Sequence, residues 1–346
     1  MLKPLRLLLI LLAVLCPVLA QEDGPYVLWK GDEARVFRIH EGKVQEERHR
    51  GAFRLALPEL TTALTLAPEA PEPVQDDYQA PEKILALSDI HGQLTAARRL
   101  LQAHHVVDAR GRWSFGRGHL VVVGDTMDRG PQVTEAYWFF RSLESQALRA
   151  GGRVHHLLGN HELLLINGDL RYLNPKYAQP PPGLPPISAL YGPDSEIGRW
   201  LRTRPTLLRL GPFLFVHGGI SPAFLTRNLD LNQTNDLIRA ALGHSPHPGS
   251  EGAFLVHQEG PLWYRGFLPD FSPASTDQEV NRAATRLKVQ AFVVGHTTLE
   301  QVCTFHHGRV YAIDAGLKDG RPGEAWLWQG GKVRRALADG RVETLP

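Results

Sequence analysis

The chain has 346 residues, of which 38 are basic and 36 acidic, so its formal net charge is only +2. A charge this small argues against a protein that binds nucleic acid or an anionic membrane through a global positive field. With 43% hydrophobic residues, the chain is long enough to bury a sizeable core in one large or two modest domains.

The first 20 residues have the pattern of a secretory signal. Lys3 and Arg6 precede the apolar run Leu7–Leu15, and Val18-Leu19-Ala20 provides a cleavage site. The run is too short for an ordinary membrane-spanning helix. We therefore expect residues 1–20 to be removed and the mature protein to be periplasmic or secreted, with no stable membrane anchor. An uncleaved anchor is the alternative interpretation.

Removal of this leader changes both charge and cysteine content. Without Lys3 and Arg6 the formal charge falls from +2 to zero, so nucleic acid is not an expected partner. Cys16 also leaves with the signal, and Cys303 remains as the one cysteine of the mature sequence. No intrachain disulfide can form, so the core must be stabilised by packing.

Residues 21–60 are predicted to form an N-terminal β element. The short apolar or alternating runs Tyr26–Trp29, Arg35–Ile39 and Lys43–Arg48 are separated by turn residues, which is typical of antiparallel strands. Residues 61–81 contain several prolines and little apolar periodicity, and they predict a surface linker without secondary structure.

An alternation of strands and helices begins at residue 82 and predicts an α/β catalytic core over residues 82–320. The predicted strands are Ile84–Leu87, Leu120–Val123, Val154–Leu158, Phe213–Val216, Ala291–Val294 and Val310–Ile313. The predicted helices are Leu94–Ala103, Val133–Ala150 and Ser195–Thr203. Residues 321–346 predict a C-terminal β hairpin around Gly330-Gly331 that packs on the core.

Polar clusters follow five of these strands. They read Ser88-Asp89-Ile90-His91-Gly92, Gly124-Asp125-Thr126-Met127-Asp128-Arg129-Gly130, Gly159-Asn160-His161-Glu162, His217-Gly218-Gly219 and Gly295-His296-Thr297. Asp89 and His91 are two residues apart, so an extended segment directs both side chains to one side. Carboxylate and imidazole ligands together suit Mn, Fe or Zn rather than Ca or Mg. The sequence therefore predicts a transition-metal site at the carboxyl ends of the strands.

In this order the motifs Asp-x-His, Gly-Asp-x-x-Asp-Arg-Gly, Gly-Asn-His-Glu, His-Gly-Gly and Gly-His-Thr resemble those of the calcineurin-like metallophosphoesterases, and within them the phosphoprotein phosphatase (PPP) family. The resemblance runs from about Lys83 to about Gly316. The segments 23–27 and 260–266 further resemble the bacterial Shewanella-like protein phosphatases. The resemblance implies a four-layer α-β-β-α sandwich with small β additions at both ends.

The resemblance also implies two metal ions and their ligands. Asp89, His91 and Asp125 would hold the first ion. Asp125 would also bind the second ion, together with a further set of ligands. That set is Asn160, His217 and His296. The ions would be divalent or trivalent Mn, Fe or Zn, and the nucleophile would be a hydroxide that bridges them.

Four further residues correspond to catalytic positions of the family. Arg129 matches a phosphate-binding arginine, and Arg265 is similar to a second one; a surface ion pair is the alternative for Arg265. His161 would protonate the leaving oxygen, with Asp128 holding its imidazole.

Other polar residues near these motifs have structural interpretations. His155 and His156 should point to opposite faces of a strand and bond within the core. Glu162 is expected to support the loop rather than bind metal. Asp314 is either a carboxylate that supports a ligand or one that closes a turn.

The leaving-group side of the site is the least defined by sequence. Residues 171–191 are rich in proline and tyrosine, and Tyr172, Tyr177 or Trp263 could stack on an aromatic leaving group. Ordinary loop packing explains these residues equally well.

Together the motifs and the resemblance imply an exported, dimetal-dependent phosphatase that hydrolyses phosphomonoesters. The expected substrate is a phosphorylated protein or peptide, on serine or threonine, on tyrosine, or on both, or a small phosphomonoester. One alternative is a dinucleoside polyphosphate hydrolase, which shares nearly the same motifs, although export argues against a cytoplasmic substrate. The other is a phospholigand-binding protein without turnover, against which the complete set of expected residues argues.

Overall fold

Successive side chains of the core strands face two different layers, as expected where both faces of a sheet are covered. In β7 (Lys83–Leu87), Ile84 and Ala86 pack between two sheets, whereas Leu85 and Leu87 pack against helices. The computed structural model describes residues 22–57, 60 and 63–345, so the predicted leader lies outside the described residues.

The first six-stranded sheet carries the first three polar clusters at the ends of its parallel strands. Its order is β17 (Val342–Glu343), β16 (Lys332–Leu337), β15 (Glu324–Gln329), β7, β8 (His119–Val122) and β9 (Arg153–His156). Strands β7, β8 and β9 are parallel, and β15 pairs antiparallel with β7. The predicted C-terminal hairpin is therefore part of this sheet.

The second six-stranded sheet carries the last two clusters. Its order is β13 (Cys303–Phe305), β14 (Val310–Ala312), β12 (Ala291–Val294), β11 (Phe213–Val216), β10 (Leu207–Leu210) and β6 (Asp77–Tyr78). Strands β11, β12 and β14 are parallel. The sequence analysis did not predict β10 or β13.

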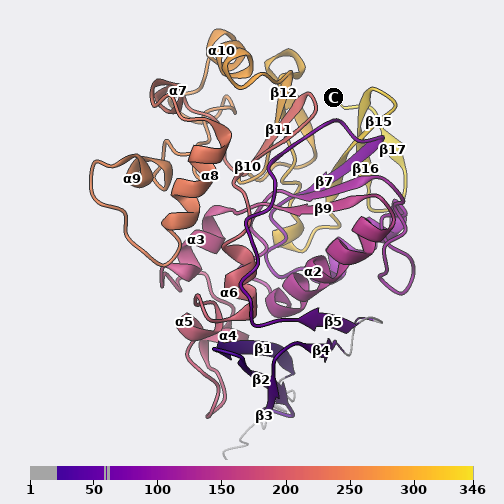
Figure 1. Ribbon diagram of the computed structural model, residues 1–346. Helices are drawn as coiled ribbons and strands as arrows, with labels where there is room; N and C mark the ends of the chain where they lie inside the picture. The colour runs from indigo at the N-terminus through magenta and orange to yellow at the C-terminus, as the bar shows by residue number, and fades with distance from the viewer. Residues whose placement is uncertain (1–21, 58–59, 61–62, 346) are drawn as a thin grey trace, which may run out of the picture.

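The two sheets pack face to face through a shared apolar cluster that includes Val121, Phe215, Val293 and Trp326. On the outside, α1 and α2 cover the first sheet, and α7, α8 and α10 pack beside the second (Figure 1). The predicted four-layer α-β-β-α architecture is confirmed. The helices are α1 (Leu94–Ala103), α2 (Val133–Arg149), α3 (Asn160–Ile166), α4 (Pro175–Ala178), α5 (Ile187–Leu190), α6 (Glu196–Leu201), α7 (Pro222–Thr226), α8 (Leu231–Ala240), α9 (Glu251–Leu255) and α10 (Asp277–Leu287), with 3-10 turns η1 (His306–Gly308) and η2 (Leu317–Asp319).

The predicted N-terminal strands form an antiparallel sheet at the bottom of Figure 1, made of β1 (Asp23–Lys30), β2 (Glu33–His40) and β3 (Lys43–Arg50). The expectation that residues 61–81 lack secondary structure is wrong. This segment contains β5 (Ala63–Leu66), which pairs with β4 (Phe53–Ala56), and β6, which pairs with β10. Both strands are short, and β6 also depends on a distant partner, so local periodicity does not reveal them.

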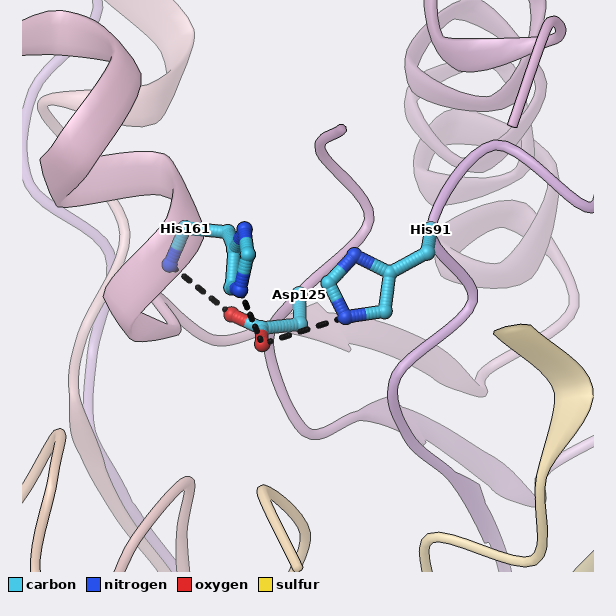
Figure 2. A group of neighbouring side chains, drawn as sticks. All are labelled: His91, Asp125 and His161. Carbon is cyan, nitrogen blue, oxygen red and sulfur yellow. Dashed lines mark hydrogen bonds and ion pairs between the residues drawn. The ribbon is translucent and has the colours of Figure 1, made fainter. Parts of the chain in front are cut away.

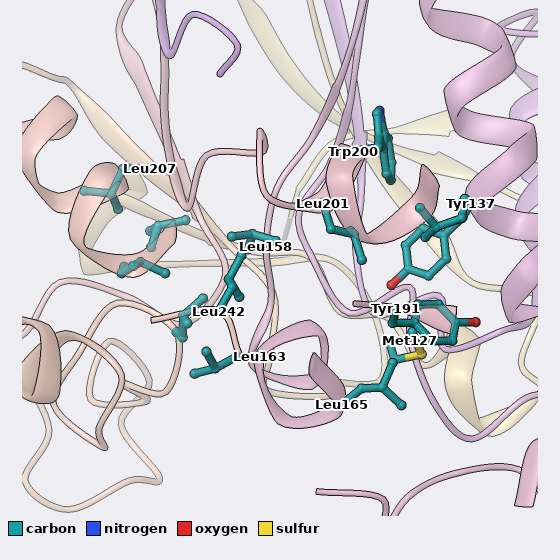
Figure 3. Packing of buried hydrophobic residues seen from close by; sticks show 14 of the residues in the cluster. Met127, Tyr137, Leu158, Leu163, Leu165, Tyr191, Trp200, Leu201, Leu207 and Leu242 are labelled. Carbon is teal, nitrogen blue, oxygen red and sulfur yellow. The ribbon is translucent and has the colours of Figure 1, made fainter. Parts of the chain in front are cut away.

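A hydrophobic cluster lies beneath the loop that follows β8. Figure 3 shows Met127 of this loop beside Tyr191, with Leu158 and Trp200 in the same cluster. Met127 is buried between the two aspartates of its motif, so core packing fixes the loop that carries Asp125 and Asp128. None of the helices in the described part of the chain is long and apolar enough to cross a membrane.

Candidate active site

The five polar clusters meet because they follow neighbouring strands at the same edge of each sheet. Backbone hydrogen bonds join the loops: the N–H of His91 donates to the Asp125 carbonyl over 2.9 Å, and the N–H of Gly295 donates to the His217 carbonyl over 2.9 Å. Gly159 permits a close approach of two loops, since a Cβ there would lie 2.1 Å from Asp125 Oδ1.

Several of the predicted site residues adopt a left-handed backbone that is costly for residues other than glycine. Their φ angles are 53° at Asp89, 45° at His91, 54° at Asp125, 70° at Asp128, 64° at Arg129 and 64° at His296. Such conformations persist only where the surrounding structure imposes them. In these loops a strained backbone therefore directs several polar side chains toward one centre, at a cost in backbone stability.

The Asp125 carboxylate lies at the centre of the site and is 1% exposed. Its Oδ2 atom is 3.4 Å from His91 Nε2 and 3.2 Å from His217 Nε2. Figure 2 shows His91 and His161 approaching Asp125 from opposite sides. One carboxylate oxygen is therefore shared by imidazoles from two sheets, which is the arrangement predicted for a bridging ligand.

The side chains form two groups of potential metal ligands around Asp125. His91 and His161 belong to one group and His217 and His296 to the other, with all ligand atoms of a group within 4.8 Å. Asn160 Oδ1 lies 2.9 Å from His217 Nε2, on the side of the second group. The predicted ligand Asp89 is near the first, with Oδ1 3.9 Å from His91 Nε2. His161 thus occupies a position in which it could be a ligand as well as an acid.

Two buried ligand atoms have no hydrogen-bond partner among the described residues, namely Asp89 Oδ1 and His296 Nε2. Leaving a buried polar atom unpaired costs about 1–3 kcal/mol. The second carboxylate oxygen of Asp89 does have partners, because Ser88 Oγ and the backbone N–H of His296 both donate to Asp89 Oδ2. An unpaired carboxylate oxygen and imidazole nitrogen, in a group of carboxylate and imidazole donors, fit transition-metal ions.

In His91 and His217, the Nδ1 atom contacts a backbone carbonyl, so the Nε2 atom faces the centre of the site. His91 Nδ1 lies 2.6 Å from the Met127 carbonyl, and His217 Nδ1 lies 2.8 Å from the Val123 carbonyl. These contacts fix the ring orientation and direct each Nε2 toward Asp125, as is common for metal-binding histidines.

The charges of the buried side chains also favour a bound cation at the centre of the site. Burial lowers the pKa of His217, but the Asp125 carboxylate outweighs burial and raises that pKa to about 9. Burial would raise the pKa of Asp125, but His217 and His161 hold it well below its ordinary value. The pKa of His296 is lowered well below 6.5 by burial. The buried Asp125 carboxylate therefore favours positive charge at the centre, and a bound cation would take the place of the proton on His217.

Glu162 supports the loops, as predicted, and the number of its bonds was not foreseen. Its carboxylate accepts hydrogen bonds from five donors, which are the N–H groups of Asp125, Thr126, Met127 and Gly159 and the hydroxyl of Tyr137. Without Glu162, three successive amides of the loop after β8 and the amide of Gly159 would be buried donors without this acceptor. This single carboxylate therefore sets the shape of the loop that carries Asp125.

The predicted acid and its partner are in contact. His161 Nδ1 lies 2.7 Å from Asp128 Oδ2, and His161 Nε2 lies 3.9 Å from Asp125 Oδ2. The Asp128 carboxylate is fully buried. His161 is held through one nitrogen, which leaves Nε2 facing the centre of the site.

The two predicted phosphate-binding arginines differ in burial. Arg129 is exposed, with its guanidinium 5.0 Å from the ring centre of Tyr172. Arg265 is partly buried, and its Nη1 donates to the His296 carbonyl over 2.9 Å and to Thr297 Oγ1 over 3.0 Å. Arg265 is therefore fixed next to a predicted metal ligand by two hydrogen bonds.

The residues given structural interpretations behave accordingly. His155 Nε2 lies 3.0 Å from His119 Nδ1, and His156 Nε2 lies 2.9 Å from Thr126 Oγ1, both in the core. Asp314 is fully buried and accepts from Thr298 Oγ1 over 2.6 Å. Lys318 Nζ, four residues further along the chain, is another Asp314 partner, at 3.2 Å. Burial and the nearby Asp89 charge raise the pKa of Asp314 to about 6.

Comparison with known proteins decides the family. The sequence model of the calcineurin-like phosphoesterases matches residues 82–299. An uncharacterized protein of Schizosaccharomyces pombe is 32% identical over 260 residues, which is 72% of this chain and 78% of that protein. The chain belongs to the calcineurin-like phosphoesterase family.

Within this family the chain is similar to named phosphatases. Shewanella-like protein phosphatase 2 of Arabidopsis thaliana is 25% identical over 298 residues, covering 72% of this chain and 75% of that protein. The crystal structure of a cold-active protein-tyrosine phosphatase from a psychrophilic Shewanella species matches with a TM-score of 0.86 and 36% identity, covering 94% of this chain and 99% of that one. The predicted family is confirmed, and the protein is a phosphoester hydrolase with the phosphatase activity of this family.

Proposed function

We propose that this calcineurin-like phosphoesterase is an exported phosphatase that uses two transition-metal ions to hydrolyse phosphomonoesters of proteins or peptides. The observation that carries the proposal is the shared Asp125 Oδ2 atom, which lies within 3.4 Å of imidazole nitrogens from both ligand groups. The proposed ligands are Asp89, His91, Asp125, Asn160, His217 and His296. Two ions held there would lower the pKa of a water molecule and stabilise negative charge on the phosphoryl oxygens.

In this proposal His161 supplies the proton to the leaving oxygen. Asp128 holds Nδ1 at 2.7 Å, which places the transferable proton on Nε2, the nitrogen that faces Asp125. The buried Asp128 carboxylate also stabilises the imidazolium form that donates this proton. The transfer leaves a neutral imidazole that remains hydrogen-bonded to Asp128.

The arginines bind and orient the phosphate group. Arg265 Nη1 donates hydrogen bonds to the His296 carbonyl and Thr297 Oγ1. These bonds fix the plane of the guanidinium group, and therefore the directions of its other N–H donors. Planar guanidinium groups pair with two phosphate oxygens at once. Arg129 approaches from the loop after β8 and is exposed, so it can meet an incoming ester before the phosphate reaches the buried ligands.

The proposal of a protein or peptide substrate rests on relatives and on the site. The Shewanella enzyme is named as a protein-tyrosine phosphatase and the plant relative as a protein phosphatase. Likeness to the former extends over nearly the whole chain, which includes the segments that surround the ligand loops. The proposal of export rests on the charged start, apolar run and cleavage pattern of residues 1–20.

A substrate panel tests the proposed class. The metal-loaded mature protein would be assayed with a phosphotyrosine peptide, a phosphoserine peptide of the same sequence and a dinucleoside tetraphosphate. We expect turnover of at least one peptide to exceed that of the dinucleotide. Preferential hydrolysis of the dinucleotide, or tight peptide binding without turnover, would contradict the proposed substrate class. Export is tested separately by comparing the mass of the protein recovered from periplasm or medium with that of the full chain.

A further inference from the structure

Tyr172 lies on the segment between α3 and α4 and is attached to the loop of Arg129. Its carbonyl accepts a 2.9 Å hydrogen bond from the Arg129 N–H. Two residues further on, Asn174 Nδ2 donates to the Arg129 carbonyl over 2.6 Å. This segment is therefore fixed to both backbone groups of Arg129, even though Tyr172 is 39% exposed.

The Tyr172 ring contacts two groups to which we assign roles in the reaction. Its centre lies 4.9 Å from that of the His161 ring, at an interplanar angle of 54°. The guanidinium of Arg129 lies 5.0 Å from the same centre and that of Arg171 lies 5.6 Å away. A single exposed aromatic side chain thus contacts both the predicted acid and a predicted phosphate ligand.

The other two aromatic side chains that the sequence suggested for this role are placed differently. Tyr177 is only 6% exposed, and its hydroxyl is bonded to the Val133 N–H and the Pro131 carbonyl. Trp263 lies edge-on to the predicted metal ligand His296, with ring centres 5.8 Å apart. Of the three, Tyr172 is the one in contact with the acid.

The position of the acid defines where the leaving group lies. A general acid must lie about 3 Å from the oxygen that it protonates. His161 Nδ1 is bonded to Asp128, so this oxygen must lie next to His161 Nε2. The rest of the leaving group is attached to that oxygen, and the exposed ring of Tyr172 lies against the His161 ring beside it.

We propose that Tyr172 contacts the leaving group and determines the preference between aryl and alkyl phosphate esters. The proposal rests on the proposed phosphatase function and adds the residue that distinguishes its substrates. An aryl leaving group gains an offset or edge contact with the Tyr172 ring, whereas an alkyl group gains only its smaller apolar contact. Arg129 and the leaving group approach the same ring, so phosphate binding and leaving-group recognition occur side by side.

The test compares kcat/KM for phenyl phosphate and for an alkyl phosphate in the wild type, Tyr172→Phe and Tyr172→Leu. Within one protein the ratio of the two values cancels any general loss of active enzyme. We expect the aryl-to-alkyl ratio to fall about three- to tenfold in Tyr172→Leu and to be retained in Tyr172→Phe. Leu170→Ala is the matched control, since Leu170 is 40% exposed on the same segment and should leave the ratio unchanged.

A binding measurement without turnover gives a second readout. Phenylphosphonate and inorganic phosphate would be compared as competitive inhibitors, and we expect Tyr172→Leu to weaken phenylphosphonate selectively. An unchanged aryl-to-alkyl ratio in Tyr172→Leu, whatever the total activity, would overturn the proposal for Tyr172 and leave the proposed function standing. Failure of the metal-loaded wild type to hydrolyse either ester would overturn the proposed function, and this inference with it.

Discussion

The carboxylate of Glu162 accepts a 2.9 Å hydrogen bond from the backbone N–H of Asp125. A side chain at the start of α3 therefore positions the loop that follows β8. Because Glu162 also receives the N–H groups of Thr126 and Met127, the orientation of the Asp125 carboxylate depends on a residue that binds neither metal nor substrate in our account.

Replacement of Glu162 by glutamine is predicted to destabilise the protein and reduce its metal affinity. The amide presents an N–H₂ group to backbone N–H donors, so at least one buried donor loses its acceptor, at a cost of about 2–4 kcal/mol. Chemical denaturation and metal titration of Glu162→Gln would measure both effects. Glu300→Gln is the control, because the Glu300 side chain is 96% exposed; equal stability of the two variants would contradict the structural role of Glu162.

The variant His161→Asn is predicted to retain its metal ions and to lose about 100- to 10,000-fold in kcat, the usual contribution of a general acid. Elemental analysis beside steady-state kinetics separates the two roles that the geometry allows. Loss of one ion per chain would show that His161 is a ligand, as its place in the first ligand group permits, and unchanged turnover would remove it from the acid role.

Arg265→Ala is predicted to lower kcat/KM by about 10- to 100-fold, since a hydrogen bond to a charged group contributes about 1.5–3 kcal/mol. Lysine at this position should recover only part of the loss, because it lacks the planar fork of donors. The inhibition constant of inorganic phosphate should rise in both variants. A phosphate affinity equal to that of the wild type would assign Arg265 to the support of His296 alone.

Stability is predicted to fall as the pH drops below 6.5, in part because of two histidines outside the site. Burial and the nearby Arg153 lower the pKa of His119 to about 4, and burial lowers that of His155 well below its ordinary value of 6.5. Both stay neutral in the folded protein while the unfolded chain takes up protons. Each therefore reduces the free energy of unfolding by about 1.4 kcal/mol per pH unit below 6.5, until its folded pKa is reached.

Denaturation of the metal-free protein at several pH values, compared with His119→Gln, would isolate this contribution. The variant should show a shallower decline between pH 6.5 and 4, and the exposed residue His247 provides the control His247→Gln. Parallel stability curves for the wild type and His119→Gln would contradict the assignment.

The strands that carry the motifs were predictable because each is a short apolar run that ends in its own ligand residues. Asp89 and His91 were identifiable from their motif. The expected extended segment was wrong, because both residues have a left-handed backbone that the surrounding structure imposes. The strands β5 and β6 were not predictable, because they have only four and two residues. In addition, β6 becomes a strand only through β10, which lies far along the chain.

The supporting contacts at the site could not be predicted from the sequence, because they join segments that are separate along the chain. The five donors of Glu162 come from three separate stretches, and the placement of Tyr172 on His161 depends on how the loop after α3 folds back. Local pattern identifies which residues carry the chemistry, but the packing of loops decides which side chain positions another.

In the proposed active site, Asp125 joins two metal ions. Elemental analysis and phosphatase assay of the wild type and Asp125→Asn, with the exposed Asp339→Asn as control, test this arrangement most directly. We predict about two transition-metal ions per wild-type chain, with fewer ions and abolished turnover in Asp125→Asn alone. Equal metal content and equal turnover in Asp125→Asn and the wild type would contradict the account.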